Sequence, residues 1–253
     1  MADAITVPIY TVPKIVHVTY SSLDDLPEDL RSNLHAWQDL GWDVHFHSTA
    51  DNVILLSSYY PDLLSKYNSY SEEQKTIFMK YVYVHKYGGV VVNCNVKPLT
   101  DIYNDIQQEV SLCYSLTFTN YVTTDFLAGS PGHPFWMDVL GACRSPNGWL
   151  EWISPLQTSY CVGSYVLSSV FKNTKHPVRT VPQNWLGCNE CTTTCTPTVL
   201  SVTTKADSVW TVVYCYRKEI GVAAFLFCIC IVGILSMNIS SRSIVKHSKN
   251  SYF

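Results

Sequence analysis

The chain has 253 residues, 47% of them hydrophobic and 15% charged, and a formal net charge of −3. That length suits one domain with a sizeable core and a short appendage. Lysine and arginine are scattered along the chain rather than gathered into a basic patch, which argues against a nucleic-acid-binding protein. We therefore expect no nucleic-acid partner.

The first predicted elements are two strands on either side of a helix. Residues 14–20 form a β-branched run that predicts a strand. Apolar residues recur with the helical period over 26–40, and Gly41 ends that helix. The alternating run at 42–47 predicts a second strand.

Two helical regions follow. Residues 51–67 predict helical structure that is interrupted at Pro61. Ser71 is well placed to cap a further helix, which runs to about residue 86 and ends at the Gly88-Gly89 pair.

The next run, Val90-Val91-Val92, predicts a strand that is buried on both faces, as in parallel sheets. Strands that alternate with helices predict an α/β fold built from βαβ units. Ligands in such sheets bind beyond the carboxyl ends of the strands, and the triplet Asn93-Cys94-Asn95 falls at that position. The triplet is therefore the first place to look for a site.

The C-terminal end differs sharply from the rest. The stretch from Ile220 to Ser241 carries no charge and is apolar almost throughout. At about 1.5 Å per residue, such a run is long enough to cross a hydrocarbon core of about 30 Å. We predict a transmembrane helix at 219–238, a short polar and basic tail at 239–253, and a single-pass membrane protein. A buried core helix is the alternative.

The membrane-proximal segment 188–215 is rich in cysteine and threonine. Cys188, Cys191 and Cys195 are closely spaced, and Cys215 follows twenty residues later. Four thiols could bind zinc, form disulfides in an oxidising compartment, or remain free. The sequence leaves the three possibilities open.

Three segments resemble glycosyltransferase family 32, which includes fungal mannosyltransferases and bacterial capsule-synthesis enzymes. VPKIVHVTY at 12–20 is similar to the opening strand of that family. FLAGSPGHPFWMDVL at 126–140 is similar to its S-x-P-G-H-P-F-W block, and ADSVW at 206–210 to its terminal segment. The resemblance implies a GT-A-like, Rossmann-like nucleotide-sugar domain over residues 8–215, followed by the transmembrane helix.

The central family motif, approximately K-S-D-x-x-R-Y-x-x-L-x-x-x-G-G-x-Y-x-D-x-D, is only partly kept. Ile77 and Lys80 stand where the motif has Asp and Arg, and Asn93 and Asn95 replace its two metal-binding Asp. The resemblance implies that Mn²⁺ or Mg²⁺ at this asparagine pair is bound weakly or not at all. The donor-binding residues that it implies are Lys75, Ile77, Lys80, Tyr81, Gly88, Gly89, Asn93, Asn95 and His133.

Two functions follow from this pattern. The first is a membrane-anchored hexosyltransferase that moves mannose or glucose from GDP-mannose or UDP-glucose to a glycan or glycolipid acceptor. Asp125 is then the candidate for acceptor activation or for binding a sugar hydroxyl. The second is a catalytically degenerate membrane protein that binds carbohydrate or a protein partner. Under either function, the expected membrane is an endomembrane, such as the Golgi, or a viral envelope. Trp149 and Trp152 are candidates for a sugar-stacking platform, although core or membrane-proximal packing explains them more simply.

Overall fold

The computed structural model describes residues 11–20, 26–107, 110–114, 121–146, 154–186 and 199–202. The chain divides into two units, residues 1–204 and 205–253, and all described residues belong to the first. The predicted membrane helix at 219–238, the tail at 239–253 and the cysteines of the 188–215 segment lie outside the described residues and stay predictions. Within the described ranges, no helix is both long and apolar enough to cross a bilayer.

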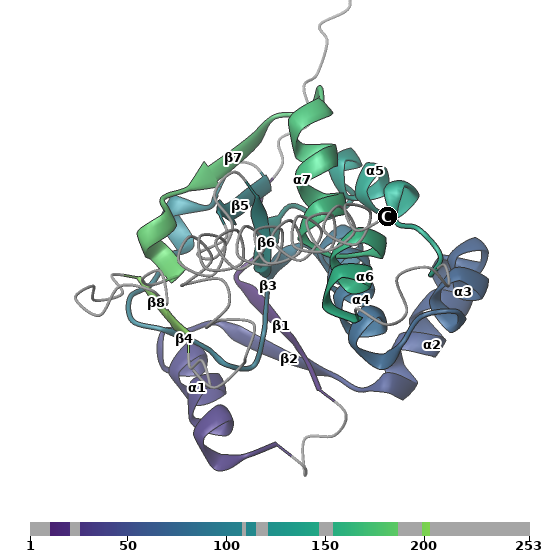
Figure 1. Ribbon diagram of the computed structural model, residues 1–253. Helices are drawn as coiled ribbons and strands as arrows, with labels where there is room; N and C mark the ends of the chain where they lie inside the picture. The colour runs from purple at the N-terminus through teal and green to yellow at the C-terminus, as the bar shows by residue number, and fades with distance from the viewer. Residues whose placement is uncertain are drawn as a thin grey trace, which may run out of the picture. The chain divides into compact units, whose positions relative to one another are not determined.

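A six-stranded sheet forms the centre of the first unit, in the order β2-β1-β3-β6-β5-β7, and a small second sheet pairs β4 with β8 (Figure 1). The strands are β1 (Ile15–Thr19), β2 (Asp43–His47), β3 (Gly89–Val92), β4 (Val96–Pro98), β5 (Val110–Tyr114), β6 (Val122–Gly129), β7 (Val178–Val181) and β8 (Leu200–Val202). β1 runs parallel to both β2 and β3, and β5 runs parallel to β7. The fold is therefore a mixed α/β fold whose main sheet is rich in parallel pairs.

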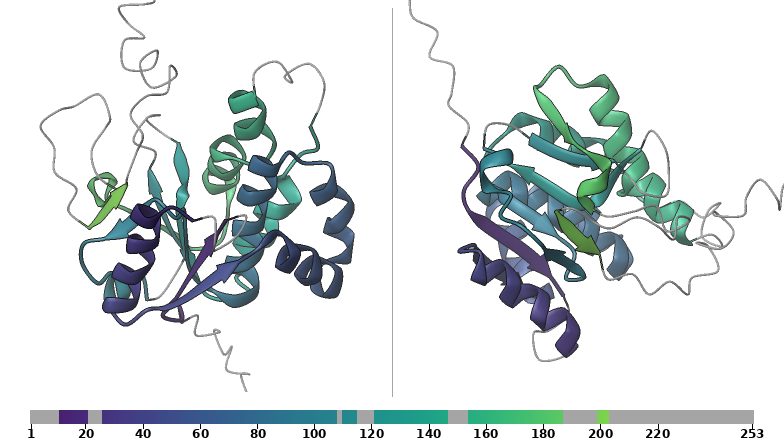
Figure 2. Two further views of the ribbon diagram at one scale, coloured as in Figure 1. Left: turned by 90° about the horizontal axis from the view of Figure 1, so that it is seen from below. Right: turned by 90° about the vertical axis from the view of Figure 1, so that its left-hand side faces the viewer.

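Helices cover both faces of this sheet. They are α1 (Glu28–Asp39), α2 (Thr49–Tyr59), α3 (Pro61–Asn68), α4 (Glu72–Tyr87), α5 (Pro134–Ala142), α6 (Ser154–Cys161) and α7 (Ser164–Asn173), with 3₁₀ turns η1 (Tyr103–Asp105) and η3 (Gln183–Leu186). Figure 2 shows α1 on one side of the sheet and the helices from α2 to α7 on the other. β3 contributes to both cores, since Val91 packs among α4, α5 and α7, whereas Val90 and Val92 pack on the side of α1.

The predicted elements of the N-terminal half are confirmed. β1, β2 and β3 and helices α1 to α4 lie where the sequence pattern placed them. Pro61 opens α3, and Ser71 forms a reciprocal capping box with Gln74 at the start of α4. Gly88, with a φ of +68°, ends that helix.

One strand direction departs from a purely parallel sheet. β6 runs antiparallel to its neighbours β3 and β5, with Val92 opposite Phe126. Because β3 ends where β6 is still near its start, Asn93 and Asp125 meet at the same edge of the sheet. This antiparallel pair is what assembles the candidate site.

Candidate functional site

A chain of hydrogen bonds connects α4 to the adjoining ends of β3 and β6. The Nζ of Lys80 donates to Oδ1 of Asn93 and to the Thr124 carbonyl, the latter at 2.9 Å. Nδ2 of Asn93 donates to Oδ1 of Asp125 at 2.6 Å. The Thr123 hydroxyl donates to the other carboxylate oxygen at 2.7 Å. We call Lys80, Asn93, Thr123, Thr124 and Asp125 the polar network.

Lys80 is the buried end of this network. Its side chain is 1% exposed on the inner face of α4, between the helix and the sheet. Burial lowers the pKa of Lys80 from its usual value, and the nearby Asp125 carboxylate opposes that shift. A lysine in this position needs acceptors, and Asn93 and Thr124 supply them.

The residues of the network do not fit a divalent cation at the first position of the triplet. A metal ion bound through Oδ1 of Asn93 would compete with the Lys80 amino group for the same oxygen and would lie beside its N–H donors. Across the described ranges, no group of three histidine, cysteine, aspartate or glutamate side chains is arranged to hold a metal ion. Hard cations such as Mg²⁺ and Mn²⁺ prefer carboxylates, which this triplet lacks.

An open cavity of about 500 Å³ lies directly outside the network. It is formed by the carboxyl ends of β1 and β3 and by the first turns of α4. We call it the amide cleft, and its lining residues are Thr19, Tyr20, Glu72, Glu73, Thr76, Asn93, Cys94 and Asn95. Most of these side chains carry a hydroxyl, amide or carboxylate group, so the cleft offers many hydrogen-bonding groups. Of its two carboxylates, Glu72 pairs with Lys75 at 2.8 Å and Glu73 accepts from Thr158.

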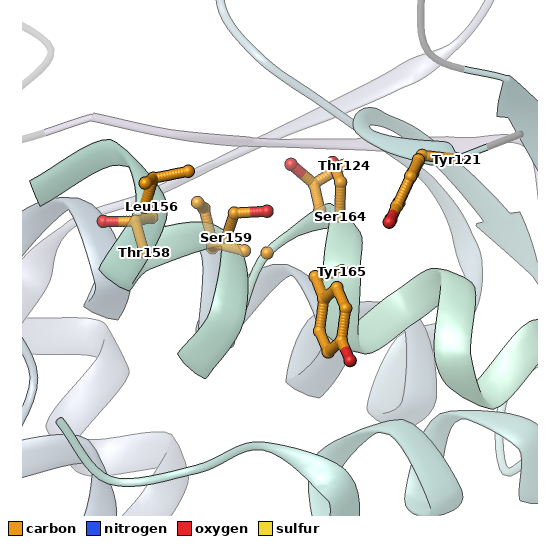
Figure 3. A pocket seen from close by; sticks show the side chains of 9 residues that line it. Tyr121, Thr124, Leu156, Thr158, Ser159, Ser164 and Tyr165 are labelled. Carbon is orange, nitrogen blue, oxygen red and sulfur yellow. The ribbon is translucent and has the colours of Figure 1, made fainter. Parts of the chain in front are cut away.

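A second cavity, of about 360 Å³, lies beside the cleft. Figure 3 shows Leu156 and Thr158 of α6 on one side of it and Tyr121 on the other. The Thr158 hydroxyl donates at 3.2 Å to Glu73, so the two cavities have a wall in common. We call this cavity the tyrosine pocket, and its lining residues are Ile77, Tyr121, Thr124, Leu156, Thr158, Ser159, Gly163, Ser164 and Tyr165.

Three predicted donor-binding residues of α4 lie away from the cleft lining. Lys75 pairs with Glu72 at 2.8 Å and lies over the ring of Tyr67. Ile77 lines the tyrosine pocket. Tyr81 is fully buried, and its hydroxyl donates to the Val162 carbonyl at 2.8 Å. The structure thus brings Lys80, Asn93, Asn95 and Asp125 to the edge of the sheet and leaves these three outside the cleft.

Gly88, Gly89 and His133 lie at the opposite end of β3. A Cβ on Gly88 would come within 2.5 Å of Pro131, and one on Gly89 within 2.5 Å of the Ile15 carbonyl. Both glycines therefore permit close packing at the amino end of the strand.

His133 is 1% exposed and caps α5, accepting a hydrogen bond from the Phe135 amide at 3.3 Å. Burial lowers its pKa. Its place in the structure matches a structural role, and the donor-binding role implied by the resemblance stays a prediction.

Several residues of the polar network and of the two cavities escaped the sequence analysis. Thr123 and Glu73 carry no motif, and only their neighbours in space give them a role. Tyr121 and Tyr165 could have been noticed from the abundance of tyrosine, which occurs 17 times in the chain. Trp149 and Trp152, for which a sugar-stacking platform was the less simple of two explanations, lie outside the described residues.

Comparison with solved structures finds distant likenesses, one of which is described here. A solved structure described as "PaToxG Glycosyltransferase" is similar to this chain at 10% sequence identity and a TM-score of 0.48, over 66% of this chain and 70% of that one. No family model and no curated protein matches the sequence. A likeness at that level carries no argument about activity, and membership of glycosyltransferase family 32 stays a prediction.

Proposed function

We propose that this protein is a glycosyltransferase-like protein that binds carbohydrate in the amide cleft and has lost metal-dependent sugar transfer. The single observation that carries the proposal is the bonding of Asn93. Its amide oxygen is taken by Lys80 and its amide nitrogen by Asp125, so both ends of the side chain are used inside the protein. The side chain that would hold a metal in the family motif is here part of the polar network.

The chemistry of the cleft supports a neutral ligand rather than a diphosphate. Glu72 and Glu73 place two carboxylates on its wall, Lys75 neutralises one of them by pairing with Glu72, and Lys80 is buried behind Asn93. A nucleoside diphosphate would bring further negative charge beside these groups, which is unfavourable without a bridging cation. Sugar hydroxyls, in contrast, both donate and accept, and therefore suit a lining of carboxylate, amide and hydroxyl groups.

A second candidate is a hexosyltransferase that works without a tightly held metal. The observation that favours it is the partly exposed carboxylate of Asp125, which Thr123 and Asn93 hold in a fixed orientation. Such a carboxylate could accept a proton from an acceptor hydroxyl. In this version the donor is GDP-mannose or UDP-glucose and the acceptor is a glycan or glycolipid.

Membrane anchoring through residues 219–238 belongs to either version of the proposal. Its support is the uncharged apolar run in the sequence. Alkaline carbonate extraction of the full chain tests it, because a spanning protein stays in the membrane pellet. Release into the supernatant would contradict the anchor and would leave the carbohydrate proposal untouched.

The central experiment uses the full chain, purified in a mild detergent. Binding of a panel of short oligosaccharides, and of GDP-mannose and UDP-glucose with and without Mn²⁺, is measured by calorimetry. Release of GDP or UDP is measured in the same samples. We expect oligosaccharide binding that Mn²⁺ does not change, and no nucleotide release.

Two variants locate the site. Asn95→Ala removes an amide from the cleft and should weaken oligosaccharide binding, whereas Asn68→Ala removes an exposed asparagine at the end of α3 and should not. Nucleotide-sugar binding that Mn²⁺ strengthens would contradict the proposal. Metal-independent nucleotide release that Asp125→Asn abolishes would establish the second candidate instead. Absence of any carbohydrate binding would overturn both.

A further inference from the structure

Three tyrosines form a row, and two of them, Tyr121 and Tyr165, line the tyrosine pocket. The ring centroids of Tyr160 and Tyr165 are 5.5 Å apart, and those of Tyr165 and Tyr121 are 6.4 Å apart, with interplanar angles of 31° in both pairs. These residues come from the end of α6, the start of α7 and the residue before β6. The row is therefore assembled by the fold from separate segments.

A positive charge stands at each end of this row. The guanidinium carbon of Arg144 lies 4.3 Å from the centroid of Tyr160 and 6.0 Å from that of Tyr165. The Nζ of Lys172 lies 5.3 Å from the centroid of Tyr121. Both cations are exposed, and neither forms an ion pair with a carboxylate in the described ranges. Each cation is held near the pocket by an aromatic ring and can still pair with an anion.

The rest of the lining combines apolar surface with hydroxyl groups. Leu156 is 53% exposed and Tyr165 is 40% exposed, so the pocket presents apolar side chains to solvent. Thr158, Ser159 and Ser164 contribute hydroxyls to the same lining. Tyrosine supplies a flat apolar face together with a polar tip, which suits the C–H face and the hydroxyls of a sugar ring. A fatty chain would leave these hydroxyl groups facing hydrocarbon, which is unfavourable.

We propose that the tyrosine pocket binds an acidic glycan, with a sugar ring against Tyr121 and Tyr165 and its anionic group paired with Arg144 or Lys172. This inference rests on the proposed function, because it treats the pocket as a subsite next to a carbohydrate-binding cleft. It adds the chemical class of the ligand. Sialic acid, uronic acid and sulfated or phosphorylated sugars all carry a suitable anion, and guanidinium pairs with each of them through two parallel hydrogen bonds.

The position of the pocket supports a single extended ligand. Thr158 lines the pocket and bonds to Glu73 of the amide cleft, and the Thr124 carbonyl accepts from Lys80 of the polar network. A glycan whose neutral units occupy the cleft can therefore reach the tyrosine row with its acidic unit. The carboxylates of the cleft and the cations of the row would set the direction in which it binds.

The test compares matched pairs of oligosaccharides on the full chain in mild detergent. Each pair is a neutral glycan and the same glycan carrying one sialic acid, one uronic acid, one sulfate or one phosphate, for example lactose and 3′-sialyllactose. Affinities are measured by calorimetry at low and at high salt. We expect the acidic member of at least one pair to bind about tenfold more tightly, with the difference shrinking at high salt.

Variants of exposed residues assign the effect to the pocket. Arg144→Gln and Lys172→Gln should each reduce the preference for the acidic member by about threefold to tenfold, and Arg144→Lys should restore part of it. Tyr165→Ala should weaken both members of a pair. The matched control is Lys86→Gln, which removes a lysine that lies over Tyr59 at the far end of α4. Thermal unfolding of each variant is measured to check that the fold is kept.

The outcomes separate this inference from the function on which it rests. Equal binding of neutral and acidic members would overturn the acidic-glycan proposal and leave carbohydrate binding standing. If Lys86→Gln lowered the preference for the acidic members as much as Lys172→Gln does, the effect would come from net charge. That result would also overturn the acidic-glycan proposal. No binding of any member would overturn both proposals.

Discussion

The amide nitrogen of Asn93 lies 2.6 Å from a carboxylate oxygen of Asp125, while the amide oxygen of the same side chain accepts from Lys80. An asparagine can donate to one partner and accept from the other, whereas an ionised aspartate only accepts. Asn93 is thus chemically matched to both neighbours. The polar network therefore depends on the amide of Asn93.

The first prediction concerns Asn93→Asp. The new carboxylate would lose the hydrogen bond that Asn93 donates and would stand beside the Asp125 carboxylate, which raises the pKa of the pair. The Lys80 amino group opposes this rise, but only in part, since burial disfavours its own charged form. A raised pKa in the folded state means that stability is lost as pH rises through it. We expect the free energy of unfolding to be about 1–3 kcal/mol lower than that of wild type at pH 7.5, and the difference to be smaller at pH 5. Urea unfolding at the two pH values measures both differences.

The control for this prediction is Asn68→Asp, which adds the same charge at an exposed position at the end of α3. It should not reproduce the pH dependence, because Asn68 lies outside the polar network. If Asn93→Asp lowered the free energy of unfolding equally at both pH values, the result would contradict the proposal that the amide is required between Lys80 and Asp125.

The second prediction is that Lys80 and Asp125 are energetically coupled through Asn93. Lys80→Met should destabilise the protein by about 3 kcal/mol, because it leaves the Asn93 oxygen and the Thr124 carbonyl without their buried donor. In the double variant Lys80→Met/Asp125→Asn, the loss of unfolding free energy should be about 1 kcal/mol smaller than the sum of the losses in the two single variants. Chemical denaturation of the four proteins gives this interaction energy, and simple additivity would show that the network is not a unit.

A third prediction follows from a histidine pair on β1 and β2. Nε2 of His17 lies 3.0 Å from the Gly88 carbonyl, and its Nδ1 lies 2.9 Å from Nε2 of His47. Since a carbonyl only accepts, His17 carries its proton on Nε2 and accepts from His47, and both rings are neutral. Burial lowers the pKa of His17 to about 3 and that of His47 to about 4.

The sign of the resulting pH dependence is fixed. Below about pH 6.5 the unfolded chain takes up protons on these histidines, whereas the folded chain does not until the pH approaches 4. The free energy of unfolding should therefore decrease as the pH is lowered from 6.5 to 4, by up to about 1.4 kcal/mol per pH unit for each histidine. Unfolding free energies over this range measure the slope. His47→Gln should reduce it, while the same change at the exposed His35 should leave it unaltered.

Local chemistry explains which parts of this fold could be predicted. The capping box at Ser71 and the glycine that ends α4 depend on residues adjacent in sequence. The short strands could be recognised from β-branched runs, and the parallel pairing of β1, β2 and β3 from the alternation of strand and helix. The caps and the short strands are decided within a few residues of where they occur, whereas the parallel pairing follows from the order of strands and helices along the chain.

The candidate site was less predictable because it depends on strand direction. The antiparallel course of β6 brings Asp125 to Asn93 from 32 residues away, and no local pattern specifies that direction. The family motif also groups Gly88 and His133 with Asn93, yet a strand of four residues, about 13 Å long, separates them from it. Motif order along the chain therefore overestimates how many residues share one cavity.

The last prediction tests why β3 begins with a glycine, Gly89. Gly89 has a φ of +84°, and an added Cβ would lie 2.5 Å from the Ile15 carbonyl, whereas Gly132 has a φ of +70° with nothing within 4 Å of an added Cβ. Gly132→Ala should lower the free energy of unfolding only by the cost of placing a non-glycine residue in the left-handed region, about 1–2 kcal/mol. Gly89→Ala adds a backbone clash inside the β1–β3 pair and should lose about 3 kcal/mol or more, since the strands must separate. Thermal and urea unfolding of the two variants measure the difference, and equal losses would show that the conformation of Gly89, and not its contact with β1, is what requires glycine.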